Sequence, residues 1–128
     1  MMCMALFLSG LEVNTVKINK NSDLRFWEEY YGDKQFAEDF HGNLMCKDGY
    51  GKRNFFVRYY GRKIYCSWNI HHILPLSCGG TNAKYNLLCT NIATNEEAGD
   101  RITFWIDDAL YQVKRIQETN KHEIIRIN

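Results

Sequence analysis

The sequence contains a single proline, Pro75, and none of its five cysteines stands in a C-x-x-C pair. A structural zinc site usually takes its ligands from such close pairs, so a zinc knuckle is the less favoured interpretation. An odd number of cysteines without a spacing pattern is typical of free thiols. We therefore expect reduced, mostly buried cysteines in a protein of a reducing cytoplasm.

The sequence also lacks an excess of charge of one sign and a long apolar run. Sixteen basic residues face fifteen acidic ones, which does not indicate a nucleic-acid partner but leaves room for a local basic patch. The apolar run in "MMCMALFLSG" is about eight residues long and too short to span a bilayer, so we expect no membrane partner. No Lys or Arg precedes it, which makes a cleaved signal peptide the weaker alternative. We expect a buried first strand that continues into "LEVNTVKIN".

The 128 residues include 45% hydrophobic and 14% aromatic ones, enough for the core of one domain over 1–128. Local patterns predict an α+β fold. We expect helices at about 24–32, capped by Ser22 and Asp23 and ended by Gly32, and at 34–42. Short strands and loops are expected over 43–63, with longer strands at 63–73 and 85–92. A helix is expected from Thr94, and strands at 102–116 and 121–127.

The stretch "WNIHHILPLSCGGTNAKYN", residues 68–86, places two histidines just before the only proline. An extended chain points neighbouring side chains to opposite faces, so one histidine can face the core and the other a cleft. Alternatively, both could turn toward one ion from a bent strand end. Taken singly, adjacent histidines, a Gly-Gly pair and isolated asparagines are ordinary surface, turn and cap residues. The joint spacing of four residues, three in this stretch and one nine positions after it, is what makes the pattern notable: His71, His72, Asn86 and Asn95.

These residues carry a resemblance to a known family. The segment "IHHILPLSCGGTNAKYNLLCTNIATN" resembles the HNH endonucleases, in which His-Ile-x-Pro, a Gly-Gly loop, Asn-Leu and a final Asn or His build a ββα-metal core. The resemblance covers roughly residues 68–100, with a core motif over about 64–101. It is weaker over the N-terminal helices and the additional C-terminal strands. The overall form is similar to small stand-alone HNH proteins of phages and bacteria, which implies a cytoplasmic location in a bacterial host.

The resemblance implies a role for each residue of the motif. His72 would be the general base that activates water against a DNA phosphodiester, because histidine supplies a pKa near neutrality. His71 and Asn95 would hold one divalent metal ion. Asn86 would fix the loop and orient His72, or serve a purely structural purpose.

One position departs from the common pattern of the family. His71 stands where an aspartate is frequent, and Gly99, one turn after Asn95, cannot bind a metal. A site of one imidazole and one amide carries no negative charge. We expect one ion, Mg²⁺ or Mn²⁺, with Ni²⁺ and Zn²⁺ favoured by the imidazole. Glu96 and Asp100 could approach the ion only through water.

Residues 47–63 mix basic, aromatic and glycine residues, a pattern that suits phosphate contacts and base stacking. A solvated loop around a partly buried strand is the alternative. The predicted DNA contacts are Lys52, Arg53, Arg58, Arg62 and Lys63. Lys114, Arg115 and Arg126 could extend this patch. Asn82 and Asn91 are expected to be loop caps, and His41 and His122 to be exposed.

The sequence thus predicts a metal-dependent HNH endonuclease that cleaves DNA. A small cutter of this kind could form a homodimer to break both strands. The main alternative is a nucleic-acid-binding module that keeps the scaffold but does not cleave, which the missing carboxylate favours. A third interpretation is a domain in which a metal ion has only a structural role, and such a domain would unfold when a chelator removes the ion.

Overall fold

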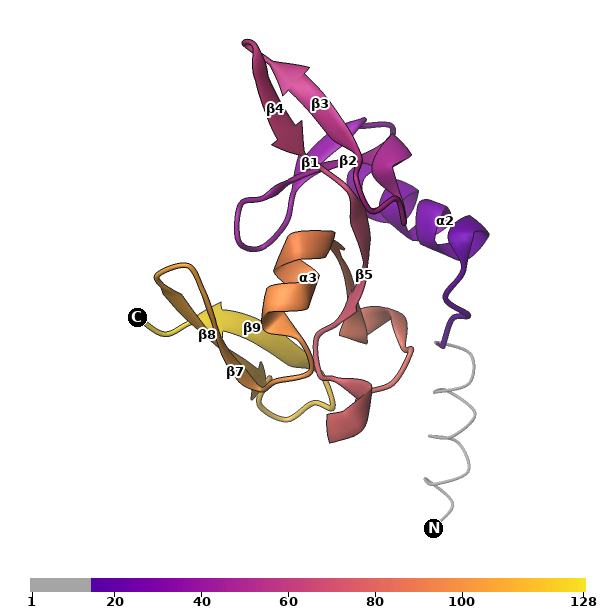
Figure 1. Ribbon diagram of the computed structural model, residues 1–128. Coiled ribbons are helices and arrows are strands. Elements are labelled where there is room, and N and C mark those ends of the chain that lie inside the picture. The colour runs from indigo at the N-terminus through magenta and orange to yellow at the C-terminus, as the bar shows by residue number, and fades with distance from the viewer. Residues whose placement is uncertain (1–14) are drawn as a thin grey trace.

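The computed structural model describes residues 15–128, which form a mixed α+β fold (Figure 1). The two described α-helices are α2 (Lys20–Tyr31) and α3 (Ile92–Ala98). The strands are β1 (Phe36–Glu38), β2 (Leu44–Cys46), β3 (Phe56–Tyr59), β4 (Arg62–Tyr65), β5 (Trp68–His72), β6 (Leu87–Asn91), β7 (Thr103–Ile106), β8 (Ala109–Arg115) and β9 (His122–Arg126). They form three antiparallel pairs, β1–β2, β3–β4 and β5–β6, and one antiparallel sheet, β7–β8–β9.

The predicted first strand lies mostly outside the described residues. Thr15 forms an isolated antiparallel bridge with Ala83, and the Val16 N–H donates to the Asn82 carbonyl over 2.9 Å. The described end of this segment therefore lies along the loop that follows β5. Among residues 15–128, no helix is long and apolar enough to cross a membrane.

Helix α2 begins earlier than predicted. Asn19, rather than Ser22 or Asp23, is the N-cap, and its side chain accepts from the Ser22 N–H over 3.0 Å. The Ser22 hydroxyl is hydrogen-bonded to the Asn19 N–H, which completes a capping box. The predicted end is confirmed: Gly32 has φ of 66° and its N–H donates to Glu28.

The helix predicted at residues 34–42 is wrong. Residues 36–38 form β1, and the chain then turns to pair β1 with β2. The Asp39 carboxylate accepts from the backbone N–H groups of His41 and Asn43, at 3.0 and 2.9 Å. These bonds offer the backbone an alternative to helical ones, and Gly42 supplies a φ of 94°.

The strand predicted as one piece over residues 63–73 is two strands with different partners. β4 pairs with β3, whereas β5 pairs with β6. The break falls at Cys66 and Ser67, which are hydrogen-bonded to Phe55. The Cys66 N–H donates to the Phe55 carbonyl, and the Ser67 hydroxyl accepts from the Phe55 N–H. Because the chain changes sheets here, the hairpin β3–β4 leaves the body of the molecule while β5 continues into the core (Figure 1).

β5, β6 and α3 follow one another in chain order, as predicted around the histidine motif. In the β5–β6 pair, Trp68 lies opposite Asn91 and His72 opposite Leu87. Helix α3 starts directly after β6, two residues before the predicted Thr94. Asn91, expected to cap a loop, is instead the N-cap of this helix and accepts from the Ala93 N–H over 2.8 Å.

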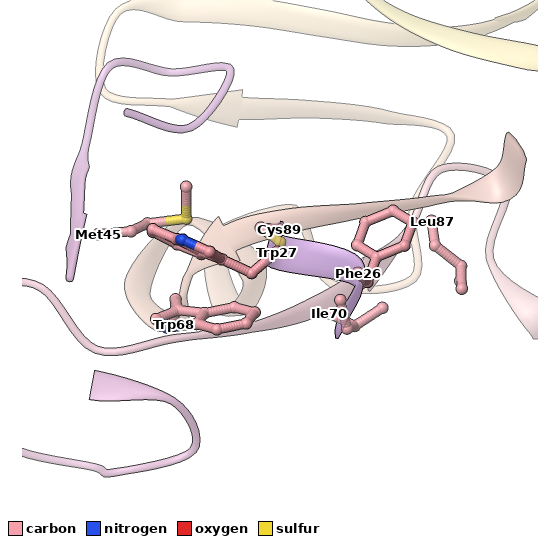
Figure 2. Close-up of a cluster of buried hydrophobic side chains, with 7 residues drawn as sticks. All are labelled: Phe26, Trp27, Met45, Trp68, Ile70, Leu87 and Cys89. Carbon is pink, nitrogen blue, oxygen red and sulfur yellow. The ribbon is translucent and has the colours of Figure 1, made fainter. Parts of the chain in front are cut away.

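Two hydrophobic clusters hold this unit. The first packs α2 against β5 and β6, with the Trp27 and Trp68 ring centroids 4.8 Å apart (Figure 2). Its buried members are Phe26, Trp27, Met45, Trp68, Ile70, Leu87 and Cys89. The second lies between α3 and the C-terminal sheet. Its buried members are Ala98, Phe104, Ile106, Ala109, Tyr111 and Val113. Cys46, Cys66 and Cys89 are free and buried, as expected, whereas Cys78 is exposed.

Candidate active-site cleft

The chain leaves β5 through an irregular loop whose shape requires its proline and glycines. Pro75 precedes a 3₁₀ turn, Leu76–Cys78, which Gly79 ends with φ of 98°. The Gly80 N–H donates to the Pro75 carbonyl over 2.9 Å. A Cβ atom on Gly80 would lie 1.8 Å from the Leu74 carbonyl oxygen, so no other residue fits there without moving the backbone.

Asn86 holds the two ends of this loop together. It is buried, and its Oδ1 accepts from the Leu74 N–H over 2.8 Å. Its Nδ2 donates to the carbonyls of Leu74 and Thr81, at 3.0 and 2.9 Å. Three of the four hydrogen-bonding sites of the amide are thus used on the loop. No hydrogen bond joins Asn86 to His72 in residues 15–128, so the structure supports only the loop-fixing half of its predicted role.

His71 is only 5% exposed and is held by Asn95 of α3. Its Nδ1 lies 2.6 Å from the Asn95 Oδ1, and the Asn95 Nδ2 donates to the Asn69 Oδ1 over 2.7 Å. Since an amide oxygen only accepts, Nδ1 carries the proton of the imidazole and Nε2 keeps its lone pair. Burial lowers the pKa of His71, the hydrogen bond to Asn95 opposes this shift, and the neighbouring His72 adds to it. The ring is therefore neutral near pH 7, which is the form that binds metals.

His72 is half-buried and has a different partner. Its Nε2 lies 2.7 Å from the Oδ1 of Asn82 in the glycine loop, so Nε2 carries the proton and Nδ1 keeps the lone pair. The sequence interpretation of Asn82 as a loop cap missed this contact. The only available signal was the position of Asn82 within the Gly-Gly loop, which does not reveal that the loop folds back over the strand end.

Both histidines line one cleft of about 310 Å³. Its wall consists of Ile70, His71, His72, Pro75, Leu76, Ser77, Asn95, Gly99 and Asp100. Asp100 is the only carboxylate among these residues, and it follows Gly99, whose φ of 59° redirects the chain at the end of α3. Glu96, the other acid considered from sequence, is exposed and does not line the cleft.

The residues of the cleft limit how an ion could bind. In the described part of the chain, no three His, Cys, Asp or Glu side chains are close enough to hold a metal together. The Nε2 atom of His71 points away from Asn95, because the Asn95 oxygen is bonded to Nδ1 on the other side of the ring. An ion on Nε2 would therefore be held by His71 and water, whereas an ion shared with Asn95 would have to replace the proton on Nδ1. The side chains present fit a weakly held ion with few protein ligands, of the kind that imidazole and amide donors select.

The basic segment forms the β3–β4 hairpin and the turn before it. Lys47 is paired with Glu28, with Nζ and Oε2 2.9 Å apart. The other five basic residues form no ion pair with any described residue. They are the five predicted DNA contacts, Lys52, Arg53, Arg58, Arg62 and Lys63.

The hairpin places these cations beside aromatic rings. Lys63 Nζ lies 4.9 Å from the centroid of the Phe56 ring, which contacts Tyr65 at 5.2 Å. Arg58 stands directly opposite Lys63 in the strand register. Like charges in facing positions destabilise a hairpin, so this pair does not serve folding. At the tip, Tyr60 is 88% exposed and has φ of 51°.

The two histidines outside the motif are less exposed than predicted. His41 is half-buried: its Nδ1 lies 2.7 Å from the Tyr111 hydroxyl and its Nε2 2.8 Å from the Asp107 carboxylate. These contacts tie the β1–β2 turn to the C-terminal sheet. His122 is also half-buried and lines a second cavity. Tertiary contacts with residues far apart in the chain explain the burial of His41.

Comparisons with protein-family models, with curated proteins and with solved structures give no match for this chain. The chemistry of the cleft and of the hairpin is therefore the basis for assigning a function.

Proposed function

We propose that this protein is a metal-dependent endonuclease of the HNH type, which hydrolyses phosphodiester bonds in DNA with one divalent ion. One observation carries the proposal: two consecutive histidines at the end of β5 line the same cleft, and α3 contributes the Asn95 side chain that holds one of them. The chain order β5, β6, α3 supports a ββα-metal core around this cleft.

In this proposal, His72 acts as the general base. The bond between its Nε2 and Asn82 leaves Nδ1 free to take a proton from water as the water attacks phosphorus. The proton moves to Nδ1 while the bond from phosphorus to the leaving 3′ oxygen breaks. Asn82 fixes the tautomer that makes Nδ1 the basic atom, and it stabilises the imidazolium through the same hydrogen bond.

His71 and Asn95 would hold the ion. A bound divalent cation supplies charge neutralisation for the phosphorane and for the leaving oxygen. An ion held by both side chains would replace the proton between the His71 Nδ1 and the Asn95 Oδ1, which are 2.6 Å apart in their hydrogen bond. Since both ligands are neutral, we expect Mn²⁺, Co²⁺, Ni²⁺ or Zn²⁺ to support activity at lower concentration than Mg²⁺. Higher activity with Mg²⁺ at low micromolar metal would contradict this preference.

The β3–β4 hairpin would hold DNA. The five cations of this hairpin and of the turn before it have no ion pairs among the described residues, so they are free to replace counterions on phosphates. The second candidate function is a nucleic-acid-binding module that does not cleave. The observation that favours it is that, within residues 15–128, no carboxylate is hydrogen-bonded to His71 or Asn95.

The test is cleavage of supercoiled plasmid by the wild type, His72→Ala and His41→Gln, with EDTA or each of the divalent metals. His41→Gln is the matched control, because it removes a histidine that lies outside the cleft. We expect metal-dependent nicking by the wild type and the control, and none by His72→Ala. A wild type that shifts DNA on a gel but cleaves no plasmid, single-stranded or branched DNA with any metal would establish the binding module instead.

A further inference from the structure

A second cavity, of about 370 Å³, shares the glycine loop with the candidate active site. Leu74, Gly79, Gly80 and Thr81 line this cavity, whereas Pro75, Leu76 and Ser77 of the same loop line the cleft of the histidines. The remaining wall comes from Tyr85, Asn86, Arg115, Asn120 and His122. None of these described lining residues is acidic. The cavity therefore lies next to the proposed cleavage site and presents cationic and neutral groups only.

The register of the C-terminal sheet directs two basic side chains to the same face. Arg115 stands opposite His122, and Lys114 stands opposite Glu123. Since side chains alternate along a strand, Arg115 and His122 face the cavity together, and Lys114 and Glu123 lie on the other face. The Arg115 Nε donates to the Thr119 carbonyl over 2.7 Å, which fixes the guanidinium. Its terminal nitrogens form no hydrogen bond or ion pair within residues 15–128.

An aromatic ring completes the cavity. Tyr85 lies in the 3₁₀ turn Lys84–Asn86, and the Nζ of Lys121 is 5.5 Å from the centroid of its ring. A fixed guanidinium, an imidazole and a tyrosine ring are the groups that bind a phosphate and stack on a base. The volume is within the range of cavities that hold small ligands.

We propose that this cavity binds one nucleotide of the substrate strand, next to the phosphate that is cleaved. Arg115 and His122 bind its phosphate, and Tyr85 contacts its base. The identity of the ligand as part of a DNA strand rests on the proposed nuclease function. The cavity and its charge do not depend on that function, so the two proposals fail in different experiments.

The primary test compares Arg115→Gln with Lys114→Gln in the His72→Ala background, which prevents cleavage. Each variant removes one positive charge from neighbouring positions of β8, but only Arg115 faces the cavity. Binding of a labelled oligonucleotide is measured by fluorescence anisotropy in EDTA at several salt concentrations. We expect Arg115→Gln to weaken binding about five- to tenfold. The slope of the logarithm of the binding constant against the logarithm of the salt concentration (the salt slope) should fall in magnitude by about 1. Lys114 was a possible extension of the DNA patch from sequence, but it stands opposite Glu123 on the face of the sheet away from the cavity. We therefore expect Lys114→Gln to weaken binding by less than about twofold, as for a charge without a phosphate contact. Equal effects of the two variants would overturn the proposal.

Two further measurements define the ligand. Tyr85→Leu keeps an apolar side chain but removes the ring, and it should weaken binding of the oligonucleotide. Arg115→Lys keeps the positive charge, so it should weaken binding less than Arg115→Gln does. In wild-type protein, a nucleoside 5′-monophosphate should shift the NMR signals of Gly79, Gly80, Thr81 and Asn120 more strongly than inorganic phosphate does. Absence of these shifts at millimolar nucleotide would overturn the cavity assignment.

The outcomes separate this inference from the proposed function. If the wild type cleaves no DNA with any metal, but Arg115→Gln still weakens binding selectively, the cavity proposal stands and the nuclease proposal fails. If the nucleotide binds and Arg115→Gln leaves DNA binding unchanged, the cavity serves a free nucleotide and the strand assignment is wrong. Thermal melting of each variant verifies that the substitutions leave the fold intact.

Discussion

The cleft at the end of β5 and the β3–β4 hairpin hold their polar side chains in opposite ways. In the cleft, His71 and the nearby Asn86 are buried, and His71, Asn86 and His72 each have a defined hydrogen-bond partner. On the hairpin, Arg58, Arg62 and Lys63 are exposed and form no ion pair with a described residue. A fixed imidazole suits chemistry, which requires a defined geometry, whereas exposed cations suit phosphate binding, which acts through charge. Substitutions in the cleft should therefore change mainly kcat, and substitutions on the hairpin should change mainly the Kd for DNA.

The largest effect is expected at the proposed base. His72→Ala should lower kcat by about 10²- to 10⁴-fold, the usual contribution of a positioned general base. The Kd for DNA should remain unchanged, because the hairpin keeps all its charges. Single-turnover cleavage and anisotropy measure the two quantities separately. Cleavage that persists in the variant would place the base elsewhere.

The next effect concerns the stability of the loop behind the cleft. Asn86→Ala removes three hydrogen bonds to Leu74 and Thr81 and leaves their backbone groups without these partners. We expect the free energy of unfolding to fall by about 2–4 kcal/mol. Asn82→Ala is the control, because the Asn82 side chain is hydrogen-bonded to His72 and not to the loop backbone among the described residues. This variant should lower kcat but cost less than about 1 kcal/mol of stability. Urea denaturation distinguishes the two, and an equal loss of stability would contradict the assignment.

A smaller effect is expected on the hairpin. Replacing Arg58 and Lys63 together by glutamine should weaken DNA binding about tenfold at moderate salt and lower the salt slope by about 2. Removing the facing like charges relieves a repulsion but also removes the contact of Lys63 with the Phe56 ring, so we expect little net change in the stability of the hairpin. Lys47→Gln is the matched control within the same segment, because Lys47 is paired with Glu28. If kcat falls in the double variant at saturating DNA, the hairpin contributes to catalysis as well as to binding, and the proposed division of roles between the two regions is wrong.

The smallest effect is expected at Asp23, a buried carboxyl group that should influence stability but not cleavage. Asp23 is buried outside the cleft and accepts from the Tyr50 hydroxyl over 2.5 Å. Burial raises the pKa of Asp23, although its hydrogen bonds oppose the shift. The proton that it binds therefore stabilises the fold below the unfolded pKa of about 4, and this contribution is lost as pH rises through the folded pKa. Asp23→Asn should raise stability at pH 7, relative to the wild type, and this gain should disappear below about pH 4. The pH dependence of the melting temperature tests this, and the cleavage rate should not change.

The sequence predicted the strands of the C-terminal sheet, the two strands around the glycine loop and the helix that follows them. Alternating apolar residues and the run of glycines determine these elements locally. It failed at residues 34–42, where the apolar spacing suits a helix but Asp39 binds backbone amides of the following turn. Periodicity does not register such a side-chain bond, because the bond depends on how the turn folds.

The site shows the same division. Local sequence alone determined that His71 and His72 stand at a strand end before a constrained loop, since Pro75 and Gly80 permit few other backbone paths. Only the tertiary structure decided that Asn95 holds His71, that Asn82 rather than Asn86 contacts His72, and that Arg115 faces the loop from the C-terminal sheet. The physical reason is that backbone conformation follows from neighbouring residues, whereas a hydrogen-bond partner is selected by the packing of elements that are distant in the chain.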